Sequence, residues 1–134
     1  MTVKVENLMT HHVVTVEPHH TVSHVQKIFK NNRFNILPVV SCGKVIGVVA
    51  PSDLLGANAK SPISSYMSTD LITIPPYSNV DVAAKLMKKN KIHHLVVTLE
   101  KELMGVLSSF DLLDLIDEHK FKSTKREGKT KMAA

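Results

Sequence analysis

The chain contains two copies of one pattern. Residues 5–57 lie on residues 63–115 without a gap when the sequence is shifted by 58 positions. Identical pairs include Met9/Met67, Pro18/Pro76, Gly47/Gly105 and Asp53/Asp111. A repeat of about 55 residues is marginal as an independent core, because so short a chain buries too little surface. We therefore expect the copies to bury apolar faces against each other about a pseudo-twofold axis, and any site between them to exist in two related versions.

The apolar pattern of each copy predicts the element order β-α-β-β-α, an α/β (α+β) fold. In the first copy we expect a strand at 13–16, a helix at 22–31 capped by Thr21, a hairpin from 36–40 and 45–49, and a second helix at 51–57. In the second copy we expect a strand at 71–74, a helix capped by Asn79, a hairpin from 95–97 and 103–107, and a helix at 109–118. The predicted domains are residues 1–60 and 61–119, followed by a disordered tail at 120–134.

The charge is unevenly distributed. The formal net charge of +5 lies entirely in residues 120–134, so residues 1–119 are neutral as a whole. A neutral body argues against a nucleic-acid-binding face, although weak, salt-dependent binding through the tail is a remote alternative. No apolar stretch approaches the ~20 residues of a membrane span, and a signal peptide is not expected. With Cys42 as the single cysteine, no internal disulfide can form, and we expect a cytoplasmic protein.

The junction between the second hairpin and the last helix carries the most informative residues. Ser108 followed three positions later by Asp111 is typical of a capping box. The open amides of a helix start favour an anion, and a hydroxyl and a carboxylate at this spacing can contact two parts of one ligand. An ordinary helix cap has the same local pattern, so on these residues alone that simpler interpretation is preferred.

The doubled unit resembles a tandem cystathionine-β-synthase (CBS) domain pair, or Bateman module. The resemblance rests on a Gly-x-x-[Ser/Thr]-x-x-Asp pattern at the end of the repeat, on Leu8-Met9-Thr10 and on Leu37-Pro38-Val39-Val40, and it covers residues 5–118. It implies a regulatory binding module rather than an enzyme. Such a module needs no obligatory cofactor, and it binds AMP, ADP, ATP or S-adenosylmethionine between the copies.

The resemblance also implies which residues bind. Ser108 and Asp111 would hold phosphate and ribose, His94 would contact phosphate, and the adenine end would be lined by Met9, Val14, Phe34 and Asn35. In the pseudo-symmetric cleft, Ala50 replaces the serine and Ile36 replaces the histidine. That weaker site would consist of Asp53, Ile72, Ile92 and His93. We therefore expect one competent site, at the second motif.

Three further expectations concern partners and metals. The module would signal to an effector protein that the sequence does not identify. It would also form a homodimer. The apolar stripes of the helices at 22–29 and 80–87 are candidate dimer contacts, or they belong to the internal core. The alternative is a ligand-free assembly module in which Ser108 and Asp111 act only as caps.

The eight histidines fall mostly in adjacent pairs. Because neighbours on a strand face opposite ways, such pairs are poor chelates, so we expect surface polar residues and no metal site, with zinc or nickel binding as a remote alternative.

Overall fold

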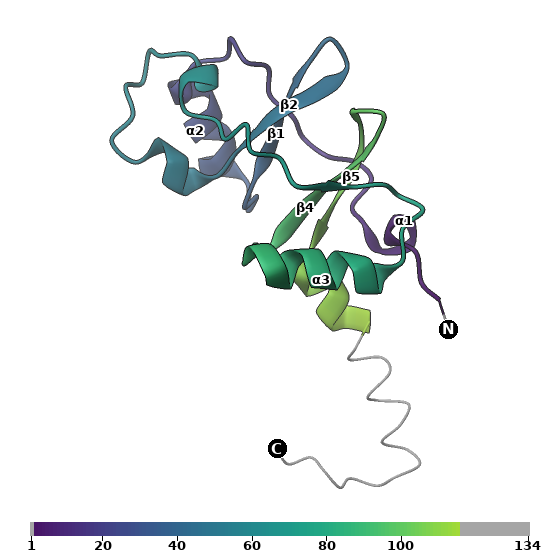
Figure 1. The fold of residues 1–134 in the computed structure, drawn as a ribbon. Helices are drawn as coiled ribbons and strands as arrows, with labels where there is room; N and C mark the ends of the chain where they lie inside the picture. Colours follow the sequence, from purple (N-terminus) through teal and green to yellow (C-terminus); the bar gives the residue numbers. More distant parts are fainter. Residues whose placement is uncertain (1, 116–134) are drawn as a thin grey trace, which may run out of the picture.

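Two β-hairpins, one from each copy, form the centre of the molecule (Figure 1). The computed structural model describes residues 2–115. β1 (Leu37–Ser41) pairs with β2 (Lys44–Val49), and β4 (His94–Leu99) pairs with β5 (Glu102–Ser108), both antiparallel. β3 (Thr73–Ile74) lies parallel to β4, which gives the strand order β1-β2-β5-β4-β3. β2 and β5 meet at the pair Lys44 and Glu102, next to both hairpin turns.

Each hairpin turns through two residues with positive φ. The angles are 53° at Cys42 and 77° at Gly43 in the first turn, and 51° at Glu100 and 72° at Lys101 in the second. Two consecutive positive φ angles match the right-handed twist of the strands on either side. The predicted hairpins are thus confirmed, and the second one forms its turn without a glycine.

One long helix per copy packs against its hairpin, and the predicted helices are confirmed. α2 (Val22–Asn31) begins at Thr21, whose Oγ1 accepts the His24 amide at 3.2 Å. α3 (Val80–Asn90) begins after Asn79, but that side chain does not cap the helix, because its Oδ1 accepts Lys4 Nζ at 3.1 Å instead. The apolar stripes face inward, with Val22, Val25, Ala83 and Met87 buried. Within residues 2–115, no helix is long and apolar enough to cross a membrane.

Three predicted elements are shorter than expected. The run at 13–16 forms only a parallel bridge from Val16 to Val39, and the run at 71–74 is reduced to β3. The predicted helix at 51–57 is a single 3₁₀ turn, η1 (Pro51–Leu54), because Leu55 is extended and Gly56 takes a positive φ of 74°. Its counterpart is helical over residues 109–115. The predicted end of that helix and the basic tail lie outside the described residues.

The segment that leads into each copy packs on the other copy. α1 (Val5–Leu8) lies beside β5 and α3 in Figure 1, and Val5 is buried in the second copy's core with Leu95 and Leu107. η2 (Ile63–Ser65) packs in the opposite direction, with Ile63 buried in the first copy's core. Bridges from Thr10 to Val106 and from Ser68 to Val48 continue each crossing. Both cores are therefore built from the two copies together.

Two glycines allow these crossings. A Cβ atom on Gly105 would lie 2.6 Å from the Thr10 carbonyl oxygen and 2.7 Å from Met9 Sδ. A Cβ atom on Gly47 would lie 2.7 Å from Met67 Sδ and 3.0 Å from the Ser68 carbonyl oxygen. The identical pairs Met9/Met67 and Gly47/Gly105 thus form two equivalent contacts, in which each methionine covers the glycine of the other copy.

We predict that Gly105→Ala lowers the free energy of unfolding by about 1–3 kcal/mol and that Gly47→Ala lowers it less, as measured by urea denaturation. The nearest atom to the new methyl group is a backbone oxygen at Gly105 but a flexible methionine sulfur at Gly47. Equal losses, or a larger loss at Gly47, would contradict this assignment of the contacts.

Candidate ligand-binding site

The predicted capping box is present at the start of the last helix. The Ser108 amide donates to Asp111 Oδ2 at 2.8 Å, and the Asp111 amide donates to Ser108 Oγ at 3.2 Å. Among the described residues, Asp111 Oδ1 accepts no hydrogen bond. These bonds satisfy two amides that a helix start leaves unpaired. They also leave one carboxylate oxygen available to a ligand.

A cavity of about 210 Å³ lies beside this cap and is lined by both copies. It brings together six of the seven residues predicted for the main site: Val14, Phe34, Asn35, His94, Ser108 and Asp111. The seventh, Met9, does not line it, because its side chain is 7% exposed and covers Gly105. The hydroxyl and carboxylate come from the second copy, and the apolar wall comes mainly from the first.

Two basic side chains of this cavity were missed by sequence reasoning. Arg33 and His12 line it together with His94. A guanidinium stays charged at any physiological pH and donates in a fork that fits the oxygens of phosphate or carboxylate. The sequence signal for Arg33 was its place directly before the predicted wall residue Phe34. With these groups opposite Asp111, the cavity can hold a ligand that carries both hydroxyl groups and an anionic group.

His94 lies between two cavities and is half-buried. Burial is the main cause that lowers the pKa of His94 below its ordinary value of 6.5, and the neighbouring His93 lowers it further. The Asp111 carboxylate acts in the opposite direction, because a nearby negative charge favours the imidazolium. At neutral pH, His94 is therefore a neutral imidazole that an approaching anion can help to protonate.

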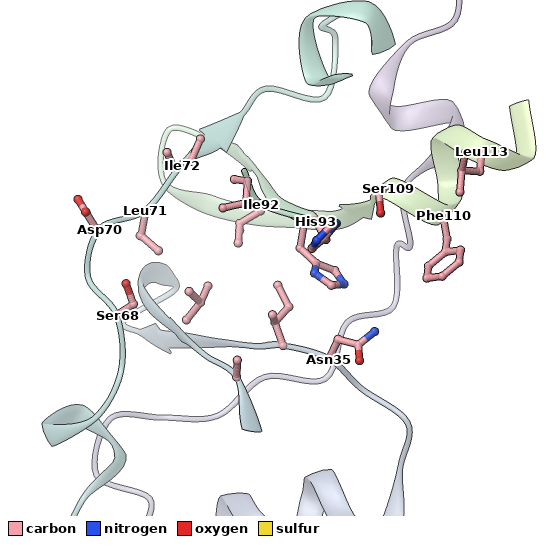
Figure 2. A pocket seen from close by; sticks show the side chains of 15 residues that line it. Asn35, Ser68, Asp70, Leu71, Ile72, Ile92, His93, Ser109, Phe110 and Leu113 are labelled. Carbon is pink, nitrogen blue, oxygen red and sulfur yellow. The ribbon is translucent and has the colours of Figure 1, made fainter. Parts of the chain in front are cut away.

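The second cavity is larger, at about 730 Å³, and has mostly apolar walls. Figure 2 shows Asp70, Leu71 and Ile72 towards one end and Phe110 and Leu113 at the other. Among residues 2–115, no lysine or arginine lines it, so these walls lack the fixed positive charge that Arg33 gives the smaller cavity.

Three of the four residues predicted for the weaker site line this larger cavity: Ile72, Ile92 and His93. The fourth, Asp53, does not line it; its Oδ2 accepts the Ala50 amide at 2.8 Å in the first motif. Ala50 itself is on the wall and offers no hydroxyl group. The two cavities share Asn35, Ile36 and His94. The less polar of the two predicted clefts thus has the greater volume.

Comparisons with known sequences identify one protein family. The CBS domain family matches residues 5–60 and again residues 63–118. The chain is 34% identical over 116 residues to the uncharacterized protein MJ0188 of Methanocaldococcus jannaschii, covering 84% of this chain and 44% of that protein. It is 28% identical to the CBS domain-containing protein YhcV of Bacillus subtilis, covering 81% of each. Inosine-5′-monophosphate dehydrogenase of Korarchaeum cryptofilum is also 28% identical, but the chain spans only 28% of that enzyme.

Solved structures agree on the fold. A putative acetoin utilization protein (AcuB) from Vibrio cholerae superposes with a TM-score of 0.82 at 25% identity, covering 95% of this chain and 99% of that one. The CBS domain pair of protein MJ0100, in complex with 5′-methylthioadenosine and S-adenosyl-L-methionine, superposes with a TM-score of 0.77 at 25% identity, covering 85% and 99%.

We predict that His93→Gln raises the pKa of His94 and that Asp111→Asn lowers it, as measured by NMR titration of the histidine ring protons. The first change removes a like charge, and the second removes the carboxylate that favours the imidazolium. Shifts of the opposite sign would contradict this arrangement of charges.

The same pKa has a consequence for stability. The pKa of His94 is lower in the folded protein, so the unfolded chain binds the proton more readily. The free energy of unfolding should therefore decrease as pH falls below about 6.5, the ordinary pKa of histidine. Stability in urea should therefore fall less steeply with acidification in His94→Asn than in the unmodified chain.

Proposed function

The chain belongs to the CBS domain family, and we propose that it is a regulatory module that binds an adenosine-containing ligand between its two repeats and passes this signal to a partner protein. The observation that carries the proposal is the cap at Ser108 and Asp111, which opens onto a cavity with Arg33 on the opposite repeat. The complex of the MJ0100 CBS pair with two adenosine compounds supports the choice of ligand class.

Each part of an adenine nucleotide has a chemical counterpart in the smaller cavity. Oδ1 of Asp111, which accepts no hydrogen bond from residues 2–115, suits the paired hydroxyls of ribose, because an ionised carboxylate is a pure acceptor. Arg33 and His94, with the Ser108 hydroxyl, suit a phosphate. The apolar side chains of Val14 and Phe34 suit the adenine ring. The larger cavity has Ala50 where the smaller one has Ser108, and among residues 2–115 it has no lysine or arginine on its walls, so we propose that it is the weaker site for a nucleotide.

Signalling follows from the composition of the walls. The cavity takes its apolar side from one repeat and its cap from the other, so a ligand contacts both at once. Binding then stabilises the relative orientation of the repeats in which both sets of contacts are made. The resulting shift is limited by the ligand's preference for that orientation. This proposal involves no catalysed reaction. We also propose that the protein is located in the cytoplasm.

Assembly of two copies is a second candidate, and one observation favours it. Phe110 and Leu113, at the start of the last helix, are 70% and 54% exposed. The stripes of α2 and α3 are buried within the molecule, so this exposed pair is the better contact for a homodimer. Light scattering of Phe110→Ser against the unmodified chain tests this role without involving the ligand.

We predict that AMP binds with one competent site per chain and that Asp111→Ala weakens it at least about tenfold by calorimetry, equivalent to about 1.4 kcal/mol. Asp53→Ala is the matched control, because Asp53 accepts the equivalent amide at the same 2.8 Å but lines neither cavity. Equal losses in the two variants would assign both residues a capping role only. Two equivalent nucleotides per chain would refute the single site.

We further predict that Arg33→Gln weakens AMP about tenfold while leaving adenosine unchanged, because only the nucleotide carries the phosphate. Lys91→Gln is the control, since Lys91 is the repeat counterpart of Arg33 and lines neither cavity.

Thermal melts give a second readout of ligand binding, since a ligand at ~100 times its Kd adds about 2.7 kcal/mol of stability. Absence of any shift with AMP, ATP or S-adenosylmethionine at millimolar concentration would favour the ligand-free assembly module.

A further inference from the structure

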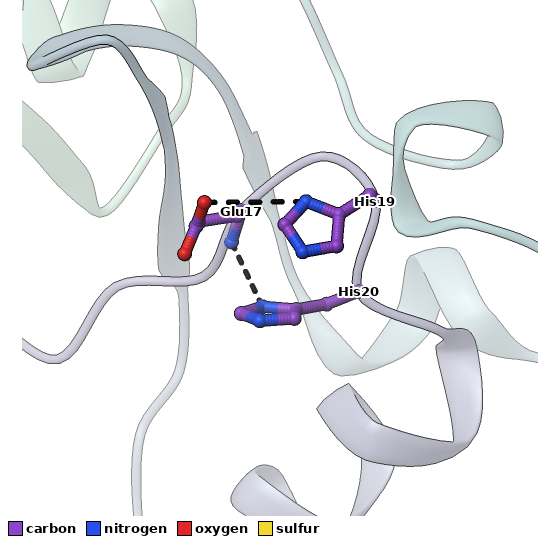
Figure 3. A group of neighbouring side chains, drawn as sticks. All are labelled: Glu17, His19 and His20. Carbon is purple, nitrogen blue, oxygen red and sulfur yellow. Dashed lines mark hydrogen bonds and ion pairs between the residues drawn. The ribbon is translucent and has the colours of Figure 1, made fainter.

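Three side chains that can ligate a metal gather at the turn before α2, and His24 lies beside them in the first turn of that helix. Glu17, His19 and His20 each offer one ligand atom, and these atoms lie within 4.8 Å of one another (Figure 3). His19 Nδ1 is 3.9 Å from Glu17 Oε1. The His20 ring lies 4.8 Å from the His19 ring and 4.5 Å from the His24 ring, centre to centre. Neighbouring histidines face opposite ways on a strand, but this pair lies in a turn, where both rings reach one place.

Backbone hydrogen bonds hold the turn in position. The His20 amide donates to the Glu17 carbonyl at 3.0 Å. The Ile63 amide donates to the His20 carbonyl at 2.7 Å, and the Ser64 amide donates to the Pro18 carbonyl at 3.1 Å. The last two bonds fix the turn to η2. The main chain that carries these side chains is therefore anchored, while the side chains of Glu17 and His19, 62% and 72% exposed, can still rotate.

The second repeat shows that the fold does not need these residues. At the four equivalent positions it has Pro75, Tyr77, Ser78 and Val82. The same turn there leads into α3 without a carboxylate or an imidazole. Folding of the repeat therefore does not explain the group in the first copy.

We propose that this turn binds one zinc-class divalent ion through Glu17, His19 and His20, with His24 as the fourth ligand. Zinc prefers imidazole nitrogen and carboxylate oxygen, usually as four tetrahedral ligands at about 2.0–2.2 Å. Ligand atoms on one such ion are about 3.4 Å apart, so rotation of the exposed side chains must bring them about 1 Å closer.

Two features of the turn set the conditions for binding. His20 Nδ1 accepts the Glu17 amide at 3.0 Å, so an ion bound at this nitrogen replaces that hydrogen bond. The ion also lies near the start of α2, where the helix dipole disfavours a cation. The Glu17 carboxylate supplies the compensating negative charge. Metal binding uses the unprotonated form of an imidazole, so zinc and protons compete for these nitrogens.

The test is titration of the full, tag-free chain with zinc chloride in a non-chelating buffer at pH 7.5. We expect one site by calorimetry and a rise in melting temperature with added zinc. His19→Gln with His20→Gln should weaken zinc at least about tenfold, and Glu17→Gln should also weaken it. Cobalt(II) in place of zinc should give the intense visible absorption of a tetrahedral site, which the double variant loses.

The matched control is His11→Gln with His12→Gln, which removes another adjacent pair and leaves the turn intact. Zinc binding should be unchanged in this control, and both double variants should keep the circular dichroism of the unmodified chain. The proposal is overturned if zinc at millimolar concentration does not bind. It is equally overturned if both double variants lose the same affinity, because that result describes nonspecific binding to surface histidines.

Discussion

The contact of each methionine with the glycine of the opposite repeat is the constraint on which the rest of the structure depends. Met9 lies over Gly105, and Met67 lies over Gly47, at distances that leave no room for a Cβ atom. These contacts let the lead-in segments cross, so that neither core is complete without the other repeat. The same crossing carries residues 10–14 of the first repeat to the cap of the second. Cores and cavities are therefore consequences of one packing arrangement.

Function depends on the positions where the repeats differ. The shared residues build the hairpins and the crossings, which have equivalent strand pairings and bridges in the two halves. Three of the differences supply polar groups of the smaller cavity: Ser108 stands against Ala50, His94 against Ile36, and Arg33 against Lys91. The Ser108 hydroxyl and the Arg33 guanidinium thus line the smaller cavity, the His94 imidazole lines both, and the walls of the larger cavity are mostly apolar. A symmetric scaffold here supports two chemically different environments.

The sequence predicts what local rules and the internal repeat can determine. Hairpins, long helices and the capping box follow from turn residues, apolar spacing and the three-residue step from Ser108 to Asp111. Met9 could not be placed, because whether an apolar residue lines a cavity or fills a core depends on the crossing of distant segments. Asp53 and Asp111 occupy the same position of the repeated motif, so the sequence does not distinguish them. The structure does, because Asp111 lines a cavity and Asp53 lines neither. The cluster at Glu17 was missed because its residues were assessed as if on a strand.

His94 makes the two cavities a single electrostatic system. Its ring is part of both walls, and burial keeps its imidazole neutral at pH 7. A phosphate in the smaller cavity favours protonation of the ring, which places a positive charge on the wall of the larger one. By linkage, whatever favours the neutral ring in the larger cavity opposes the anion in the smaller by the same free energy. Ligands bound in the two cavities would therefore affect each other through the protonation of this shared ring, with no movement of the backbone.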